Sequence, residues 1–210
     1  MKFFIEPQYF PPVDLFIHLI KSSHEIIFIS DEYKKMSFRN RCVIAGSNGP
    51  IILSVPLIGG RNQRTPMHEI LIDNRQPWQS HHWKSICSCY NHSPWFEFYK
   101  ESLSGLFLRK FSSLMDWDLA CFEWITRQLQ LRIKMETTVM DQTPADINLV
   151  NRFLPRDLEK FLPIVRYPQV FEDRTGFIPH LSILDLLFCA GTNSLKFLQT
   201  SEETQSHSNG

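Results

Sequence analysis

A histidine placed one helical turn after a tryptophan is the first candidate for chemistry in this chain. The stretch RQPWQSHHWKSICSCYNHSPWF favours a helix that begins near Pro77. One face of this helix carries residues spaced four apart, namely Trp78, His82, Ile86 and Tyr90. An imidazole near its ordinary pKa of about 6.5 can accept a proton from a sugar hydroxyl or an amine, so His82 is predicted as a catalytic base. The alternative is a half-buried core histidine beside Trp78.

The other histidines of this region lack the spacing of a metal site. Adjacent side chains on a helix diverge by about 100°, so His81 and His82 do not readily share one ion. His68 and His92 complete no pair at i and i+4, the spacing that zinc-binding helices use. No metal site is therefore predicted, and the residues name no cofactor.

Polar residues follow directly after each of the first two predicted strands. Residues 2–6 and 25–30 are apolar runs separated by a helical pattern, which predicts a strand–helix–strand unit with parallel strands. Parallel strands place their carboxyl ends at one edge of a sheet, where open α/β sheets bind ligands. We therefore expect Asp31 to lie at the same edge as Gln8 and Tyr9.

Residues 6–10 lie at the end of the first predicted strand and form a corner, called here the first corner. Pro7, Pro11 and Pro12 restrict the backbone there and would hold Gln8 and Tyr9 in one orientation at low entropic cost. Asp31 is predicted as a second catalytic group or as an acceptor for a sugar hydroxyl. Glu6 beside it would raise one of the two carboxyl pKa values by charge repulsion. Two alternatives stay open, namely prolines that only break a strand and a carboxylate that only caps a turn.

Arg41, which follows Arg39 and Asn40, is predicted to bind an anion. A guanidinium group binds phosphate or carboxylate with two parallel hydrogen bonds, and Asn40 is predicted to assist as a substrate-binding residue. Arg61 and Arg64 lie in a glycine-containing loop that could cover the same anion. The alternative for Arg41 is a solvated arginine at the end of a strand.

Aromatic residues near the histidine could form a stacking floor for a sugar or a base. These residues are Trp78, Trp83, Trp95 and Phe96. Trp78 is included among the substrate-binding candidates, together with Lys84 on the polar side of the same helix. Aromatic residues at helical spacing also build cores, so that alternative stays open.

The composition predicts one ordinary globular domain over residues 1–198 in a chain of 210 residues. Lys plus Arg equals Asp plus Glu at 22 each, so no overall charge directs the protein to nucleic acid. Five cysteines without paired spacing favour reduced thiols. The start does not resemble a signal peptide, and no apolar run reaches the ~20 residues of a membrane span, which predicts a cytoplasmic protein. The tail 199–210 has no apolar side chains and predicts disorder.

The remaining pattern predicts an α/β fold with a small mixed sheet begun by the βαβ unit and a more helical C-terminal half. FRNRCVIAG and IILSVPL flank an Asn-Gly turn, which indicates a β-hairpin, and residues 67–73 read as a further strand. Two helices are expected in 95–134, the second over 117–133 with Asp116 as its N-cap. Prolines break the segment that follows into loops, and 180–191 reads as a last amphipathic helix.

Several segments together resemble the WbqC-like protein family. IEPQYFPPVDLF resembles its opening QPxYFPxxGYF, SDEY its DDVQY, FRNRCVI its NRN+I segment, and ILSVPL its LTVPV strand. HEILIDNRQPWQSHHWKSI with YNHSPWFEFY resembles its I.I....W...H...I...Y...P.F stretch. LSILDLLFCAGTNSL resembles its closing SIxDLLxxxGP. The resemblance extends from residue 1 to about residue 195 and departs from the pattern at Glu6, at Pro12–Asp14 and at Thr192-Asn193.

This resemblance implies a role in bacterial surface-polysaccharide (O-antigen-like) synthesis, with a sugar nucleotide or another activated donor as the small-molecule substrate. His82 matches the family's histidine four residues after the tryptophan. We therefore expect a transferase, or a related modifying enzyme, that acts on a sugar nucleotide or an amino-sugar.

The alternative is a non-catalytic binding or assembly protein of the glycan-synthesis machinery. That alternative predicts an exposed apolar patch, for example on helix 180–191, and no deep pocket. A nucleotide-binding fold that holds ATP is a third, weaker hypothesis. A second copy of the chain or a glycan enzyme stays open as a partner.

Overall fold

The chain begins with a parallel strand–helix–strand unit, as predicted. The computed structural model describes residues 1–20, 24–60, 63–138, 146–157 and 164–207. Strand β1 (Lys2–Ile5), helix α1 (Val13–Leu19) and strand β2 (His24–Ile29) follow one another, and β1 pairs with β2 in parallel. The strands form because most of their side chains are β-branched or aromatic.

Two later strands complete a four-stranded parallel sheet with the order β5-β2-β1-β6. Strand β5 (Ile133–Thr138) pairs with the whole of β2, and the short strand β6 (Ile147–Asn148) pairs with β1. All pairs in this sheet are parallel, so the carboxyl ends of all four strands lie at one edge. This edge positions the candidate site.

The predicted hairpin is confirmed, and it forms a sheet of its own. Strands β3 (Arg41–Gly46) and β4 (Gly49–Ser54) are antiparallel and are joined through the Asn-Gly turn. Gly49 has a φ of +117°, a conformation that side chains with a Cβ rarely adopt. The predicted α/β class is confirmed, with the hairpin separate from the parallel sheet.

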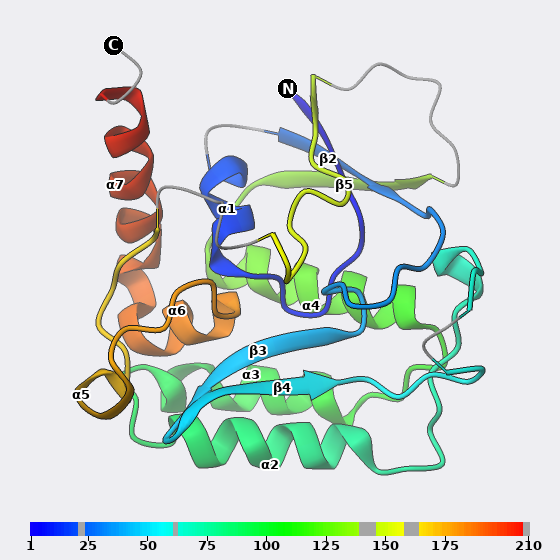
Figure 1. Ribbon diagram of the computed structural model, residues 1–210, viewed down its shortest axis with the longest axis horizontal. Helices are drawn as coiled ribbons and strands as arrows, with labels where there is room; N and C mark the ends of the chain where they lie inside the picture. The colour runs from blue at the N-terminus through cyan, green and yellow to red at the C-terminus, as the bar shows by residue number, and fades with distance from the viewer. Residues whose placement is uncertain (21–23, 61–62, 139–145, 158–163, 208–210) are drawn as a thin grey trace.

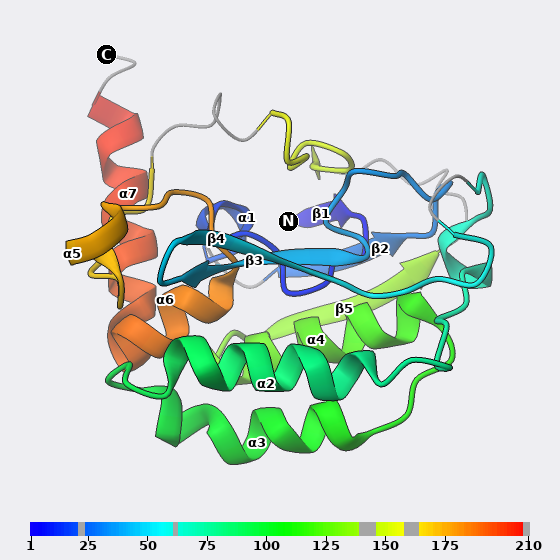
Figure 2. The same cartoon turned by 60° about the horizontal axis from the view of Figure 1, so that its bottom comes forward.

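Among the described residues, the chain has five longer helices, and α2 lies beside α3 under the hairpin (Figures 1 and 2). Their bounds are α2 Trp78–Tyr90, α3 Phe96–Leu108, α4 Leu114–Gln128, α6 Ile183–Ala190 and α7 Ser194–His207. The short helical turns are η1 Met67–Glu69, α5 Glu172–Thr175 and η3 Gly191–Asn193. Among the residues that the structure describes, no helix is both long and apolar enough to cross a membrane.

Helix α4 differs from the prediction at both ends. It begins at Leu114 because Ser113 is the N-cap and accepts a hydrogen bond from the backbone of Asp116, which lies in the first turn. At the other end, Gln130 adopts a positive φ of 54°, and the chain continues into β5. Pairing with β2 satisfies the backbone groups of 133–138 and overrides the helical pattern read for 117–133.

Two further segments differ from the sequence reading. Residues 67–73 form the turn η1 and two isolated bridges, Leu57 to Ile72 and Leu71 to Ser113, where a strand was expected. Helix α7 extends through His207 and so includes residues 199–207 of the segment whose composition predicts disorder, while 208–210 lie outside the described residues. Its start packs on the protein through the buried Leu198, and a helix begun in this way propagates readily.

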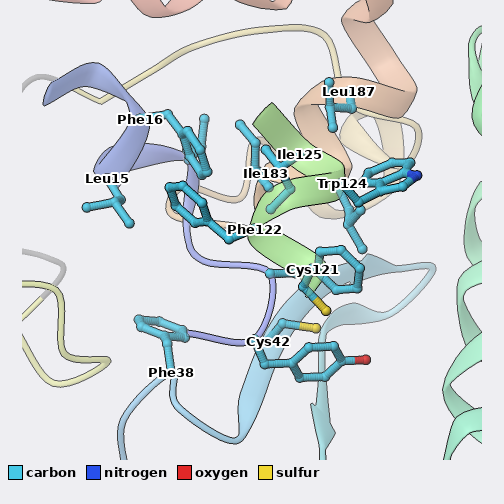
Figure 3. Close-up of a cluster of buried hydrophobic side chains, with 14 of the residues drawn as sticks. Leu15, Phe16, Phe38, Cys42, Cys121, Phe122, Trp124, Ile125, Ile183 and Leu187 are labelled. Atoms are coloured by element: carbon cyan, nitrogen blue, oxygen red, sulfur yellow. The ribbon is translucent and has the colours of Figure 1, made fainter. Parts of the chain in front are cut away.

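The core lies between the helices and both sheets. Phe122 of α4 stacks on Phe16 of α1 and meets Phe28 of β2 edge-on, with ring centroids 5.7 and 5.1 Å apart. Figure 3 shows Cys121 of α4 facing Cys42 of the hairpin, so the same core joins the two sheets. All five cysteines are free.

Candidate functional site

Polar side chains meet at the carboxyl edge of the parallel sheet. Glu6 follows the last residue of β1, Asp31 comes shortly after the end of β2, and Asn151 lies three residues beyond β6. The prediction that Asp31 and the first corner share one edge agrees with this placement. Asn151, in the proline-rich segment, was not anticipated.

Arg39 and Asn151 hold these groups in one network. Nη2 of Arg39 donates to both carboxylate oxygens of Asp31 at 2.6 and 2.8 Å, and to Oδ1 of Asn151 at 3.1 Å. Asn151 donates from Nδ2 to Asp31 at 3.3 Å and from its backbone N–H to Glu6 at 2.8 Å. Gln8 donates to the other Glu6 oxygen at 2.8 Å. Glu6 and Asp31 are therefore linked through Asn151.

The side chains of this network differ in their exposure to solvent. The Arg39 side chain is fully buried, whereas the Asp31 side chain keeps 24% of its surface exposed. Buried Glu6 and Gln8 lie behind it. Asp31 is thus a carboxylate fixed from the protein side and open to solvent on the other.

A further carboxyl group, in α4, lies in the interior near the charge of Arg39. Asp118 is completely buried, and its two oxygens have no hydrogen-bond partner among the described residues. Burial raises the pKa of Asp118 well above its usual value, and the nearby charge of Arg39 lowers it in part. Nε and Nη1 of Arg39 and Oε1 of Gln8 also lack partners within the described part of the chain. Unsatisfied buried polar atoms of this kind are rare and mark functional or hydrated places.

A cleft of about 520 Å³ opens beside this network. It is lined by Glu32, Tyr33, Lys34, Lys35, Met36, Gln63, Arg64, Leu154 and Arg156. The first of these segments follows Asp31 directly, and the last follows Asn151. The cleft therefore lies next to the same sheet edge, and Asp31 directly precedes its lining residue Glu32 but is not itself one of the lining residues. Arg64 lies on its wall, while Arg61 lies outside the described residues; that this loop covers an anion stays a prediction.

His82 lies in the aromatic core under the first corner. Its Nδ1 is 2.9 Å from the hydroxyl of Tyr9, the two rings stack, and Trp78 packs edge-on against the imidazole. Burial lowers the pKa of His82 to about 4, although a hydrogen bond to the backbone of Ser54 opposes this shift. Burial also raises the pKa of Tyr9 well above its usual value, so a protonated hydroxyl lies beside a neutral imidazole. Neither ring lines the cleft.

The remaining helix candidates lie away from the cleft. Trp78 donates from Nε1 to Asn74 at 3.0 Å and packs edge-on against Trp117 in the core. Lys84 is exposed on the opposite face of α2 from His82. Trp83 packs on Phe96, as the core alternative describes.

Asn40 and Arg41 support the cleft from inside. Asn40 accepts from the Tyr33 hydroxyl at 2.9 Å and donates to the Val55 carbonyl at 3.0 Å, so both ends of its amide are engaged. Arg41 is 6% exposed, and its Nη1 donates to the sulfur of Met36 at 3.5 Å. Since Tyr33 and Met36 line the cleft, these two predicted binding residues hold its wall in place.

Other residues of the site were not found by sequence reasoning. Asn151 and Arg156 follow a strand of two residues, which has no periodic signal. Lys34 directly follows SDEY and could have been found from that position. Asp118 interrupts an otherwise apolar face of α4, which is the only signal that it carried.

The site offers hydrogen-bonding and charged groups for an organic substrate. In the described ranges, no group of three or more His, Cys, Asp or Glu residues could hold a metal ion. The chemistry that the arrangement supports is proton transfer at Asp31 together with anion binding in the cleft.

Comparison with known proteins gives one finding. The protein-family model described as the WbqC-like protein family matches residues 6–152, which is more than half of the chain. No curated protein matches. No solved structure matches either. The matched range begins directly after β1 and contains Glu6 through Asn151, and thus the whole hydrogen-bonded network.

Proposed function

This chain belongs to the WbqC-like protein family, and we propose that it is an enzyme that transfers a group to or from a sugar nucleotide or an amino-sugar. Its setting in this proposal is surface-polysaccharide (O-antigen-like) synthesis on the cytoplasmic side of a bacterial membrane. One observation carries the proposal: Glu6, Asp31 and Asn151 reach the same sheet edge from three parallel strands, beside a cleft of about 520 Å³. This is where open α/β sheets bind substrates.

Asp31 is the proposed base. Its carboxylate is partly exposed, and Arg39 and Asn151 fix its orientation. In the reaction, an acceptor hydroxyl or amine in the cleft bonds to the transferred group and gives its proton to Asp31. The leaving group departs with the electron pair of the bond that breaks. A fixed carboxylate is suited to this step because no reorientation is needed.

His82 has a positioning role in this proposal. A buried imidazole with a pKa of about 4 is a weak base, and His82 is 7% exposed, whereas the Asp31 side chain is 24% exposed. It holds the Tyr9 hydroxyl, and Tyr9 in turn follows Gln8, which fixes Glu6. Sequence reasoning assigned proton transfer to His82, and the geometry favours Asp31 for that role.

The alternative of an assembly protein has less support. The apolar face of α6, on which it depended, is buried from Ile183 to Phe188. Some apolar surface is exposed on β4, where Ile52 is 57% and Ile51 38% exposed.

The test is the replacement Asp31→Asn, with Glu101→Gln on the exposed surface of α3 as the matched control. A substrate is first found by thermal-shift screening against nucleotides, sugar nucleotides and amino-sugars, since a ligand at a hundred times its Kd adds about 2.7 kcal/mol of stability. We expect Asp31→Asn to lower kcat by roughly 100-fold or more. Circular dichroism checks that the fold is retained. Full turnover by folded Asp31→Asn would contradict the proposal.

A further inference from the structure

The cleft beside Asp31 is strongly cationic in a protein that has no net charge. The chain has 22 basic and 22 acidic side chains. Among the described lining residues, four are basic and one is acidic, so these residues together carry a charge of +3 (four minus one). A local excess of this kind concentrates anions at one place on an otherwise balanced surface.

The basic residues come from three separate segments. Lys34 and Lys35 follow β2, Arg64 lies in the loop after the hairpin, and Arg156 lies in the segment after β6. Two of these segments also carry the catalytic edge, since Lys34 is three residues after Asp31 and Arg156 is five residues after Asn151. The cationic wall and the proposed base are therefore held by the same strands.

The ion pairs formed by the two arginines are weak. Arg64 is 91% exposed and lies 4.0 Å from Glu32, and Arg156 is 80% exposed and lies 3.3 Å from Asp157. Exposed pairs contribute little to stability, so a ligand can replace them at low cost. Arginine binds phosphate with two parallel hydrogen bonds, and lysine adds a mobile charge.

The size and charge of the cleft indicate a small polyanion. A volume of about 520 Å³ is typical of a site for a small organic molecule. A single carboxylate would require one of the four cations, whereas a diphosphate offers several charged oxygens to all of them. Leu154, although mostly buried, lines the cleft with an apolar side chain that an uncharged part of the ligand can contact.

We propose that this cleft binds the diphosphate group of an activated sugar donor, with Lys34 and Arg156 in contact with phosphate oxygens and the sugar directed toward Asp31. This inference rests on the proposed function and selects, from its two substrate classes, the one that carries phosphate. The diphosphate can belong to a nucleoside diphosphate sugar or to a polyprenyl diphosphate sugar, because both present the same oxygens.

Calorimetric titration with pyrophosphate, UDP and geranyl diphosphate tests the inference, with uridine and N-acetylglucosamine as uncharged controls. We expect the diphosphates to bind and the uncharged compounds to bind far more weakly. Binding should weaken as salt increases, because exposed charges are screened over about 8 Å at physiological ionic strength. The tighter of UDP and geranyl diphosphate identifies the source of the donor.

Charge-reversal variants locate the site. Lys34→Glu and Arg156→Glu should each weaken UDP or geranyl diphosphate binding by roughly tenfold or more, since one charged hydrogen bond has that effect. Lys196→Glu and Arg132→Glu are the matched controls because both residues are exposed and line no part of the cleft. Lys196 is on α7, at the opposite side of the molecule from the end of β2 (Figure 1).

Two results would overturn the inference: no diphosphate binds, or the charge reversals in the cleft have no more effect than the controls. If diphosphates fail to bind and an unphosphorylated amino-sugar is turned over by an Asp31-dependent reaction, the inference fails while the proposed function stands. If diphosphates bind as expected and Asp31→Asn retains full turnover, the proposed base fails and the binding site stands.

Discussion

Among single residues, His82 has the clearest consequence for stability, because burial keeps its imidazole neutral. Its pKa falls to about 4 through burial, whereas an unfolded chain leaves it near 6.5. The unfolded state therefore binds a proton between these two values, and the folded state does not. The contribution of neutral His82 to the free energy of unfolding is therefore complete above pH 6.5. It decreases as the pH falls below 6.5 and is lost as the pH falls through 4.

The replacement His82→Gln tests this linkage. Between pH 7 and pH 4, the wild-type protein should lose about 3 kcal/mol more unfolding free energy than His82→Gln, from a shift of 1.36 kcal/mol per pKa unit. At pH 7 the variant should be only about 1–2 kcal/mol less stable, through the altered Tyr9 contact. Urea titrations at several pH values measure both quantities. Parallel stability curves for the two proteins would show that His82 titrates normally.

The position of His82 was predictable only in part. The four-residue spacing of Trp78, His82, Ile86 and Tyr90 correctly predicts one buried stripe of α2. Whether the imidazole faces a ligand or the core depends on Tyr9, which is 73 residues away, and on the Ser54 backbone. No local pattern contains that information, because packing between distant segments decides it.

At the scale of elements, a buried tyrosine and a buried carboxyl group join α2, β3 and α6. The hydroxyl of Tyr90, the last residue of α2, donates to Asp185 of α6 at 2.6 Å and accepts from the Ala45 backbone in β3 at 2.9 Å. Burial raises the pKa of Asp185 to about 6, although the Tyr90 hydrogen bond lowers it in part. The folded protein therefore favours the protonated form of this buried carboxyl group, although the Tyr90 hydrogen bond by itself favours the carboxylate.

We expect Asp185→Asn to remove a pH dependence opposite in sign to that of His82. The folded pKa of about 6 lies above the unfolded value of 3.8, so the stabilisation is present below pH 3.8 and is lost as pH rises through 6. Relative to Asp185→Asn, the wild-type protein should gain about 3 kcal/mol from pH 7 to pH 4. Chemical denaturation of both proteins at each pH measures the difference. An equal slope for the two proteins would mean that the pKa of Asp185 is the same in the folded and unfolded states.

The local sequence pattern predicts those elements whose backbone hydrogen bonds form between segments that are neighbours along the chain. The βαβ opening and the Asn-Gly hairpin belong to this group, and both are confirmed. Strand β5 has a mostly exposed and polar sequence, KMETT after Ile133, and exists because β2 offers it a complete ladder. The two-residue β6 exists only through its pairing with β1. Asn151 and the wall around Arg156 were missed for the same reason, since they depend on β6.

At the scale of the whole molecule, one continuous core connects the hairpin to the parallel sheet. Ile44 of β3 and Ile26 of β2 are both fully buried in this core, although their strands belong to different sheets. Trp117 of α4, also fully buried, packs against Tyr9 of the first corner and Trp78 of α2. A shared core of this kind predicts that both sheets unfold together.

Calorimetry of Ile44→Ala and Ile26→Ala tests this cooperativity. Each replacement should lower the unfolding free energy by about 2–5 kcal/mol, because a buried cavity remains, and each should still show a single transition. Ile52→Ala is the matched control, because Ile52 is 57% exposed on β4 and its loss should cost little. If Ile44→Ala gave two transitions with only the first one shifted, the hairpin would be a separate unit. The cleft wall that Asn40 and Arg41 hold could then open without unfolding the parallel sheet, whereas a single transition means that the cleft and the Asp31 edge are stabilised together.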